Sequence, residues 1–226
     1  MKLDEGHAEK DKRGCMKKFV CVALMCLTSV LGFAQHQGSD NPAFLSSEFY
    51  PKYTASSVMM EEISGSLRIY AAQNLGRSLF SVEGDETRLL WNPAHLPWME
   101  GVSGNGVGQT IQLSCNRAFS FINILNGYVD VSNPTLFREN GRARSLRIED
   151  VDNGFVYQLD LIDEICFTGI RLERATTRVS IIITSVYEGS LHQDTCISAI
   201  IPEDSPSAFY FQGLGEGSAL SVGRRR

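Results

Sequence analysis

The sequence lacks the compact motifs that build a metal centre or a thiol-redox site. No Cys-x-x-Cys pair occurs. Beyond residue 34 the histidines are far apart: His36, His95 and His192. The same stretch has three cysteines, Cys115, Cys166 and Cys196, so at most one disulfide can form within it. We expect all three to be small apolar residues in strands and predict neither a zinc ribbon nor a redox motif.

Catalytic signatures are absent as well. The sequence has no Gly-x-Ser-x-Gly elbow, no His-Glu-x-x-His helix and no phosphate-binding loop. Acidic pairs such as Asp160/Asp163 and Glu149/Asp150 are the remaining candidates for a glycosidase site. Carboxylates beside turns are usually solvated, and nothing in the sequence separates their pKa values. We therefore predict that the protein is not an enzyme.

Basic residues are scarce in the main part of the chain. The whole chain has 21 Lys/Arg and 26 Asp/Glu. Six of the basic and four of the acidic residues precede residue 35, so residues 35–226 have a net charge of −7. Lys52 is the single lysine of that remainder. No basic stripe with interleaved aromatic residues occurs, so we expect neither a nucleic-acid partner nor attraction to an anionic membrane.

Residues 16–34 resemble a secretory signal peptide. Lys17 and Lys18 precede an apolar run, and Gly32-Phe33-Ala34 places small residues before Gln35. The 16 residues from Phe19 to Ala34 would span about 24 Å as a helix, less than a bilayer core of about 30 Å. A permanent anchor is the alternative. We expect export to the periplasm, the medium or the cell surface, with no stable membrane span after cleavage.

From residue 67 onward the chain alternates between apolar runs and turn residues. Alternation is clearest over 155–161, and Asp152-Asn-Gly154 and Asn140-Gly141 are tight-turn signals. We predict strands at 67–70, 79–82, 110–114, 119–125, 145–148, 155–161, 165–168, 179–186 and 196–201. Short strands without amphipathic helices between them are typical of an all-β, antiparallel β-sandwich of about eight strands.

The two ends of the chain differ from this central domain. We interpret 1–15 as a mis-assigned upstream extension ahead of the true start at Met16. We further interpret 35–55 as a linker, 56–202 as the sandwich and 203–226 as an irregular tail. The composition also allows a short helix over 56–62.

Four segments, in this order along the chain, carry turn glycines or polar residues: 98–111, 122–128, 140–148 and 186–198. The first holds Trp98, Glu100 and four glycines that precede a strand, so a nucleotide-binding loop is excluded and positive φ angles are expected. The second is Ile122-Asn-Ile-Leu-Asn126-Gly127-Tyr128, and the third contains Asn140, Arg142 and Arg144. The last contains Asp194-Thr195-Cys196-Ile197.

Together these segments resemble the NADase-type glycan-binding domain of exported bacterial proteins. That domain is a discoidin-like, galactose-binding-like jelly roll related to the coagulation factor 5/8 type C domains. The resemblance implies a non-catalytic module that binds a glycan or another envelope ligand through loops at one end. An envelope assembly protein that uses the sandwich for protein contacts is the alternative. The insertion 76–97, with Leu89, Leu90, Trp91 and Leu96, would then supply an apolar contact surface beside Trp98.

The resemblance implies ligand-binding positions at Trp98, Glu100, Asn126, Tyr128, Arg138, Asn140, Arg142 and Asp194. Trp98 is either a stacking platform or a core residue, and core is the more common role. Tyr128 is expected to be an exposed loop aromatic, and the arginines are donors for sugar hydroxyls or part of a solvated strand edge. Asp194 either caps a turn or faces the ligand.

Two departures from the family pattern concern calcium. Relatives carry carboxylates in a turn ahead of the tryptophan and after the final Asp-Thr-Cys-Ile pattern. Here the insertion 76–97 replaces the turn, and Ala199 follows Ser198. We therefore expect no metal and no other cofactor.

Overall fold

The computed structural model describes residues 49–76, 79–83, 88–92, 95–204, 209–212 and 221–224. The predicted leader and most of the linker lie outside these ranges. The strands are β1 Lys52–Ala55, β2 Met60–Ile63, β3 Ser66–Ile69, β4 Phe80–Glu83, β5 Arg88–Trp91, β6 Trp98–Met99, β7 Thr110–Asn126, β8 Gly141–Asp150, β9 Val156–Asp160, β10 Phe167–Tyr187, β11 Thr195–Glu203, β12 Phe209–Gln212 and β13 Ser221–Arg224. The helical elements are η1, Ala72–Gly76, and α1, Leu136–Glu139.

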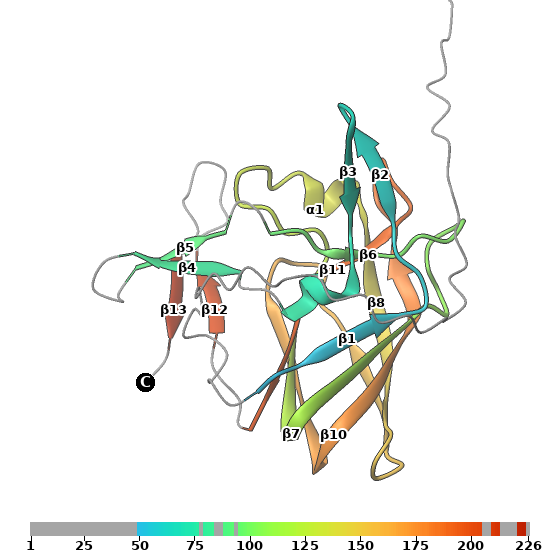
Figure 1. Ribbon diagram of the computed structural model, residues 1–226, viewed down its shortest axis with the longest axis vertical. Helices are drawn as coiled ribbons and strands as arrows, with labels where there is room; N and C mark the ends of the chain where they lie inside the picture. Colours follow the sequence, from blue (N-terminus) through green and yellow to red (C-terminus); the bar gives the residue numbers. More distant parts are fainter. Residues whose placement is uncertain are drawn as a thin grey trace, which may run out of the picture.

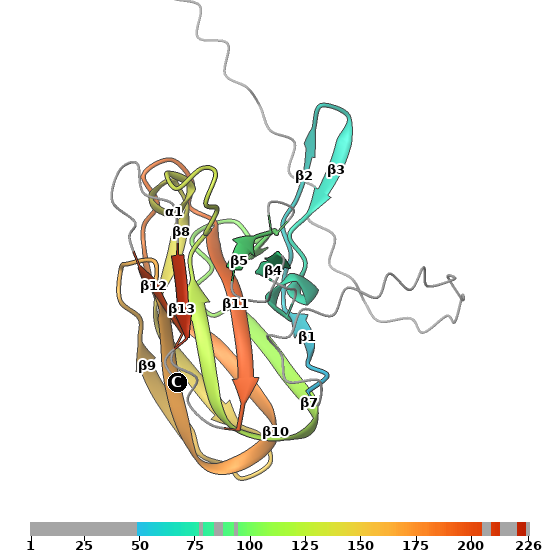
Figure 2. The same cartoon turned by 90° about the vertical axis from the view of Figure 1, so that its left-hand side faces the viewer.

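Seven strands form one hydrogen-bonded set in the order β1-β7-β10-β8-β11-β6, with β9 on β8 and a further β7–β11 pairing. All pairings are antiparallel except a short parallel contact of β11 with β8. The predicted all-β, antiparallel sandwich is thus confirmed. Figures 1 and 2 show β7 and β10 running through the body of the molecule.

The long strands β7 and β10 create the two layers. In the first half of β7, residues 111–114 pair with β1 and 110–114 with 178–182 of β10. In the second half, residues 121–125 pair with β11 and with 167–171 of β10. The register between β7 and β10 shifts on both sides of Thr176. Such irregularities bend a strand, so each long strand leaves one layer and enters the other. The sequence had predicted each of these strands as two separate ones.

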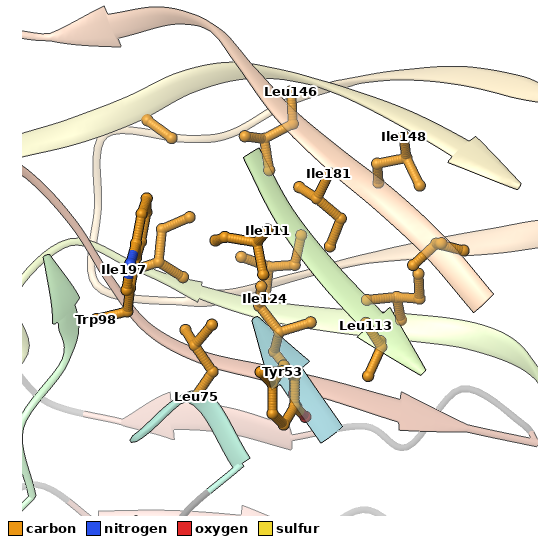
Figure 3. Packing of buried hydrophobic residues seen from close by; sticks show 14 of the residues in the cluster. Tyr53, Leu75, Trp98, Ile111, Leu113, Ile124, Leu146, Ile148, Ile181 and Ile197 are labelled. Carbon is orange, nitrogen blue, oxygen red and sulfur yellow. The ribbon is translucent and has the colours of Figure 1, made fainter. Parts of the chain in front are cut away.

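The core lies between the layers. Both halves of β7 supply fully buried residues, Ile111 and Leu113 from one layer and Ile124 from the other. Figure 3 shows them packed against Ile181 of β10 and Trp98. Apolar burial of this kind stabilises the fold by about 1.5–3 kcal/mol for each large side chain.

Two expectations about the ends of the chain change. Residues 60–63 form β2, not part of a helix, because they pair with β3 through a turn at Ser64 and Gly65, whose φ angles are 52° and 80°. The C-terminal segment is not wholly irregular, since β12 pairs with β13. The insertion forms a β4–β5 hairpin, and the side chains of its expected contact residues 89–91 lie outside the described part of the chain.

No helix among the described residues is long and apolar enough to cross a bilayer. The three cysteines within these ranges, Cys115, Cys166 and Cys196, have free thiols. Cys196 is buried in the interior, and the other two are half-buried. This placement agrees with their expected role as small apolar residues.

Shortening a core side chain tests the two-layer arrangement. We expect Ile181→Ala to lower the free energy of unfolding by about 3 kcal/mol, because Ile181 is fully buried between the layers and its loss leaves a cavity. Urea denaturation measures this change. Val156→Ala is the control, since Val156 is 52% exposed, and should change stability by less than about 0.5 kcal/mol. Equal effects of the two substitutions would contradict the assignment of the core.

Candidate loop-end binding site

One end of the sandwich collects segments that are far apart in the sequence. We call it the α1 end and define it by residues 100–109, 127–144, 161–166 and 187–194. The strand register brings them together, because Gly141 pairs with Thr195 and Arg142 pairs with Tyr187. The loop after β10 is also tied to α1, where the Ser190 amide donates to the Arg138 carbonyl at 3.0 Å.

Arg142 is the main connection within the α1 end. Its side chain is only 5% exposed and its Nε donates to Asp163 Oδ1 at 2.7 Å. A second guanidinium nitrogen donates to the carbonyls of Asn140 at 2.7 Å and Phe137 at 3.1 Å. Arg142 therefore holds the segment around α1 against the loop that contains Asp163, and little of it is left for a ligand.

Arg138 binds the same carboxylate from the solvent side. Its guanidinium donates to the carboxylate of Asp163 and, at 2.9 Å, to the Asp163 carbonyl, while its side chain stays 58% exposed. Although partial burial opposes the effect, the bonds from Arg142 and Arg138 hold the pKa of Asp163 below its usual value. Arg138 is thus both anchored and accessible.

The two predicted asparagines bind the backbone. Asn126 is 2% exposed, and its amide group bonds both the carbonyl and the N–H of Ala143, at 2.6 and 3.1 Å. Asn140 donates its side-chain amide to the Leu136 carbonyl at 2.9 Å and so closes the end of α1. Because each amide has a protein partner, both residues shape the loops.

Tyr128 is buried, contrary to the expectation of an exposed loop aromatic. It is 6% exposed and packs edge-on against Tyr70, with the ring centroids 6.1 Å apart. Burial raises the pKa of Tyr128. The Asn126-Gly127 turn, with Gly127 at a φ of 76°, directs the ring inward under the β2–β3 hairpin.

Trp98 is a core residue, the more common of its two expected roles. It is fully buried, and its indole N–H donates to the Ser57 carbonyl at 3.0 Å. A ring without an exposed face offers no platform for a sugar.

Glu100 is a fully buried carboxyl group below the glycine loop. Its two oxygens accept the N–H of Val102 at 2.8 Å and of Thr195 at 3.4 Å. Burial and the nearby Asp194 carboxylate raise the pKa of Glu100 to about 7 against the two N–H bonds. A Cβ on Gly106, whose φ is 75°, would lie 2.6 Å from the Glu100 side chain, so the loop can close over Glu100 only with glycine there.

Asp194 is half-buried and connects β11 to β8. Its backbone carbonyl accepts the Gly141 N–H at 3.0 Å, and the turn-capping role of its side chain stays a prediction. The carboxylate faces Glu100 closely enough to raise its pKa. The eight predicted positions therefore gather at or beside the α1 end, mostly as buried supports, and their contact with a ligand stays a prediction.

A calcium site does not fit the residues present. Ala199, where relatives carry a carboxylate, is 1% exposed in an apolar cluster with Leu125, Val129 and Phe137. Within the described ranges no three His, Cys, Asp or Glu side chains are placed to hold a metal ion.

Apart from Arg138, the accessible side chains are neighbours of the predicted ones. Arg144 is exposed, and its guanidinium lies 5.7 Å from the centroid of the half-buried Tyr187 ring. The Tyr187 hydroxyl donates to the Leu161 carbonyl at 3.1 Å, and Arg142 lies 5.9 Å from the same ring. Tyr187 and Asp163 were not among the sequence-predicted site residues. The position of Tyr187 at the end of an apolar run was the available signal.

A family model named NAD glycohydrolase translocation F5/8 type C domain matches residues 85–202. The chain belongs to this family. The match begins after the β2–β3 hairpin, so that hairpin precedes the F5/8 type C segment. No curated protein matches the chain significantly.

Solved structures with a similar chain path include carbohydrate-binding modules. A family 32 module of C. perfringens NanJ, solved with galactose, is 11% identical, with a TM-score of 0.43 over 67% of this chain and 92% of that one. Another family 32 module from Clostridium perfringens, solved with GalNAc-β-1,3-galactose, is 13% identical, with a TM-score of 0.42 over 68% and 94% of the two chains.

Arg142 and Arg138 form a matched pair for mutation because both bind Asp163. We expect Arg142→Ala to lower the free energy of unfolding by about 2–3 kcal/mol, since it leaves buried carbonyls without their donor and removes the buried one of the two arginines that bind Asp163. Arg138→Ala should cost less than about 1 kcal/mol, because that pair is exposed to solvent. Urea denaturation at pH 7 compares them. Equal losses would show that Arg142 is not the main anchor.

The raised pKa of Glu100 predicts that the free energy of unfolding depends on pH. Because its pKa rises from 4.5 when unfolded to about 7 when folded, its contribution is complete below pH 4.5 and is lost as the pH rises to about 7. Relative to wild type, Glu100→Gln should gain about 2–3 kcal/mol between pH 4.5 and pH 8. Chemical denaturation across that range measures the difference. Glu173→Gln, at an exposed position of β10, should show the same pH dependence of the free energy of unfolding as wild type. If Glu100→Gln also showed the wild-type pH dependence, the prediction would be refuted.

Proposed function

We propose that this F5/8 type C domain is an exported, non-catalytic module that binds a glycan at the α1 end. The exposed Arg144 guanidinium beside the Tyr187 ring carries the proposal. Arg138 adds a second accessible guanidinium at the same end. This grouping combines fork-shaped donors with an aromatic side chain, the chemistry that shallow sugar sites use.

The two side chains suit a sugar for different reasons. The planar guanidinium of Arg144 presents several N–H groups at fixed angles, which can bind neighbouring hydroxyl oxygens of one sugar ring. The Tyr187 ring carries negative charge density on its face and attracts polarised C–H groups. Its hydroxyl is already bonded to the Leu161 carbonyl, so the ring is oriented before a ligand arrives and binding loses less conformational entropy.

The support below these side chains also favours binding over catalysis. The Asp163 carboxylate is engaged by two arginines, and Glu100 is enclosed by backbone N–H groups. A general acid or base must reach the reacting group directly or through one water. Both carboxylates instead hold parts of this end together: Asp163 binds Arg138 of α1 and Arg142 of β8, and Glu100 binds the backbone of Val102 and Thr195.

Export follows from the interpretation of residues 16–34 as a signal peptide. An exported F5/8 type C domain would meet glycans of the cell envelope or of a neighbouring cell. The ligand's identity is the part of the proposal that an experiment has to supply.

A glycan array followed by calorimetry tests this function with the purified protein. We expect specific hits whose affinity falls at least about tenfold in Arg144→Ala and Tyr187→Leu, which corresponds to about 1.4 kcal/mol. Arg171→Ala and Tyr50→Leu, at exposed positions elsewhere, should bind like wild type. Circular dichroism confirms that each variant folds. A blank array, hits that ignore both substitutions, or turnover of NAD or of a glycoside would contradict the proposal.

A further inference from the structure

The β2–β3 hairpin exposes an unusual amount of apolar surface. Met60 is 41%, Ile63 40%, Leu67 65% and Ile69 44% exposed. Figures 1 and 2 show the hairpin standing away from the sandwich in both views. Clusters of exposed apolar side chains on a soluble domain usually mark a contact surface.

The cross-strand register gathers three of these residues on one face. Met60 is opposite Ile69, and Glu62 is opposite Leu67. Opposed residues share a face, as do residues two apart along a strand. One face of the hairpin therefore consists of Met60, Leu67 and Ile69 around a single carboxylate, Glu62. We call it the hairpin face.

The hairpin is held in position from below. Tyr70, which follows β3, is 3% exposed, and its N–H donates to the Met59 carbonyl at 3.0 Å. The Met99 N–H donates to the Tyr70 carbonyl at 3.3 Å, and the Tyr70 hydroxyl donates to Glu61 of β2. A two-stranded hairpin alone is marginally stable in water. This one is preorganised, so docking would cost little ordering entropy.

We propose that the hairpin face docks into another protein, whose complementary surface is an apolar groove with lysine or arginine at its rim. The charged residues of the hairpin indicate the chemistry of that partner. Glu61 and Glu62 are neighbours on β2, and Arg68, the one basic residue of the hairpin, is opposite Glu61. Glu62 is left beside Leu67 on the hairpin face, where a basic group of the partner would neutralise it as the apolar residues are buried.

The same charges disfavour the other occupants. A second copy stacked on the hairpin face would bring two Glu62 carboxylates into one apolar contact, and like charges there are destabilising. An anionic bilayer would repel the two glutamates. The hairpin lies before residue 85, where the family match begins, so the hairpin face is outside the matched F5/8 type C segment.

Photo-crosslinking in the cells that make the protein tests the proposal with the full chain. Benzoylphenylalanine at Leu67 should give one discrete adduct with a different protein, whereas the same probe at Val156, which is 52% exposed, should not. Mass spectrometry should place the crosslink in an apolar segment with lysine or arginine next to it. Capture alone does not support the proposal, so the captured protein is then purified and its affinity measured.

We expect Leu67→Ser and Glu62→Lys each to weaken that binding at least about tenfold, with melting temperatures that stay close to wild type. Glu173→Lys, a charge reversal at an exposed position of β10, should bind like wild type. An adduct of twice the chain's mass, adducts with lipid alone, no adduct, or binding that ignores Glu62→Lys would each overturn the proposal. Glycan affinity should be unchanged in both hairpin variants, which separates this surface from the α1 end.

Discussion

The pairing of β7 with β10 is the constraint on which the other parts depend. The two strands remain antiparallel neighbours from Phe167 and Leu125 in one layer to Ile182 and Thr110 in the other. Because both bend between these points, one pair of strands belongs to both layers and sets their separation. β1, β8 and β11 then add to edges that this pair has already positioned. The order of the loops at the α1 end follows from that arrangement.

The α1 end shows what a loop-rich surface requires before it can bind anything. Loops carry backbone N–H and C=O groups that no neighbouring strand satisfies, and buried ones must find other partners. Arg142, Asn126 and Asn140 supply these partners with their side chains. The polar residues that are most visible in the sequence therefore serve as supports. Their neighbours, the exposed Arg144 and the half-buried Tyr187, are the residues that we propose to meet a ligand.

Two surfaces of the chain have different chemistry. The α1 end is polar and carries guanidinium groups, whereas the hairpin face is apolar with one carboxylate. The Tyr70–Tyr128 contact lies between them, since Tyr128 follows the Asn126-Gly127 turn and Tyr70 follows β3. A glycan module with a separate protein contact would combine the two roles that the sequence left as alternatives.

The sequence by itself determined the fold class, the positions of most strands and the family. Alternating residues reveal which face of a strand is buried. Of the four glycines in the first segment, Gly104, Gly106 and Gly108 have the expected positive φ angles, whereas Gly101 does not. These signals are local, so one sequence is enough to read them. The order of the motifs also suggested that the site residues share one end, because every second connection of an antiparallel sandwich lies at the same end.

Only the tertiary structure decided which of those residues are exposed. Tyr128 and Arg142 are buried because Tyr70 and Asp163, distant in the sequence, lie over or against them. No pattern in the sequence indicates such contacts. The continuity of β7 and β10 was likewise hidden, since their bends contain polar residues that resemble turns. Burial of a polar side chain depends on partners brought from elsewhere in the chain, and only the folded arrangement of the strands supplies them.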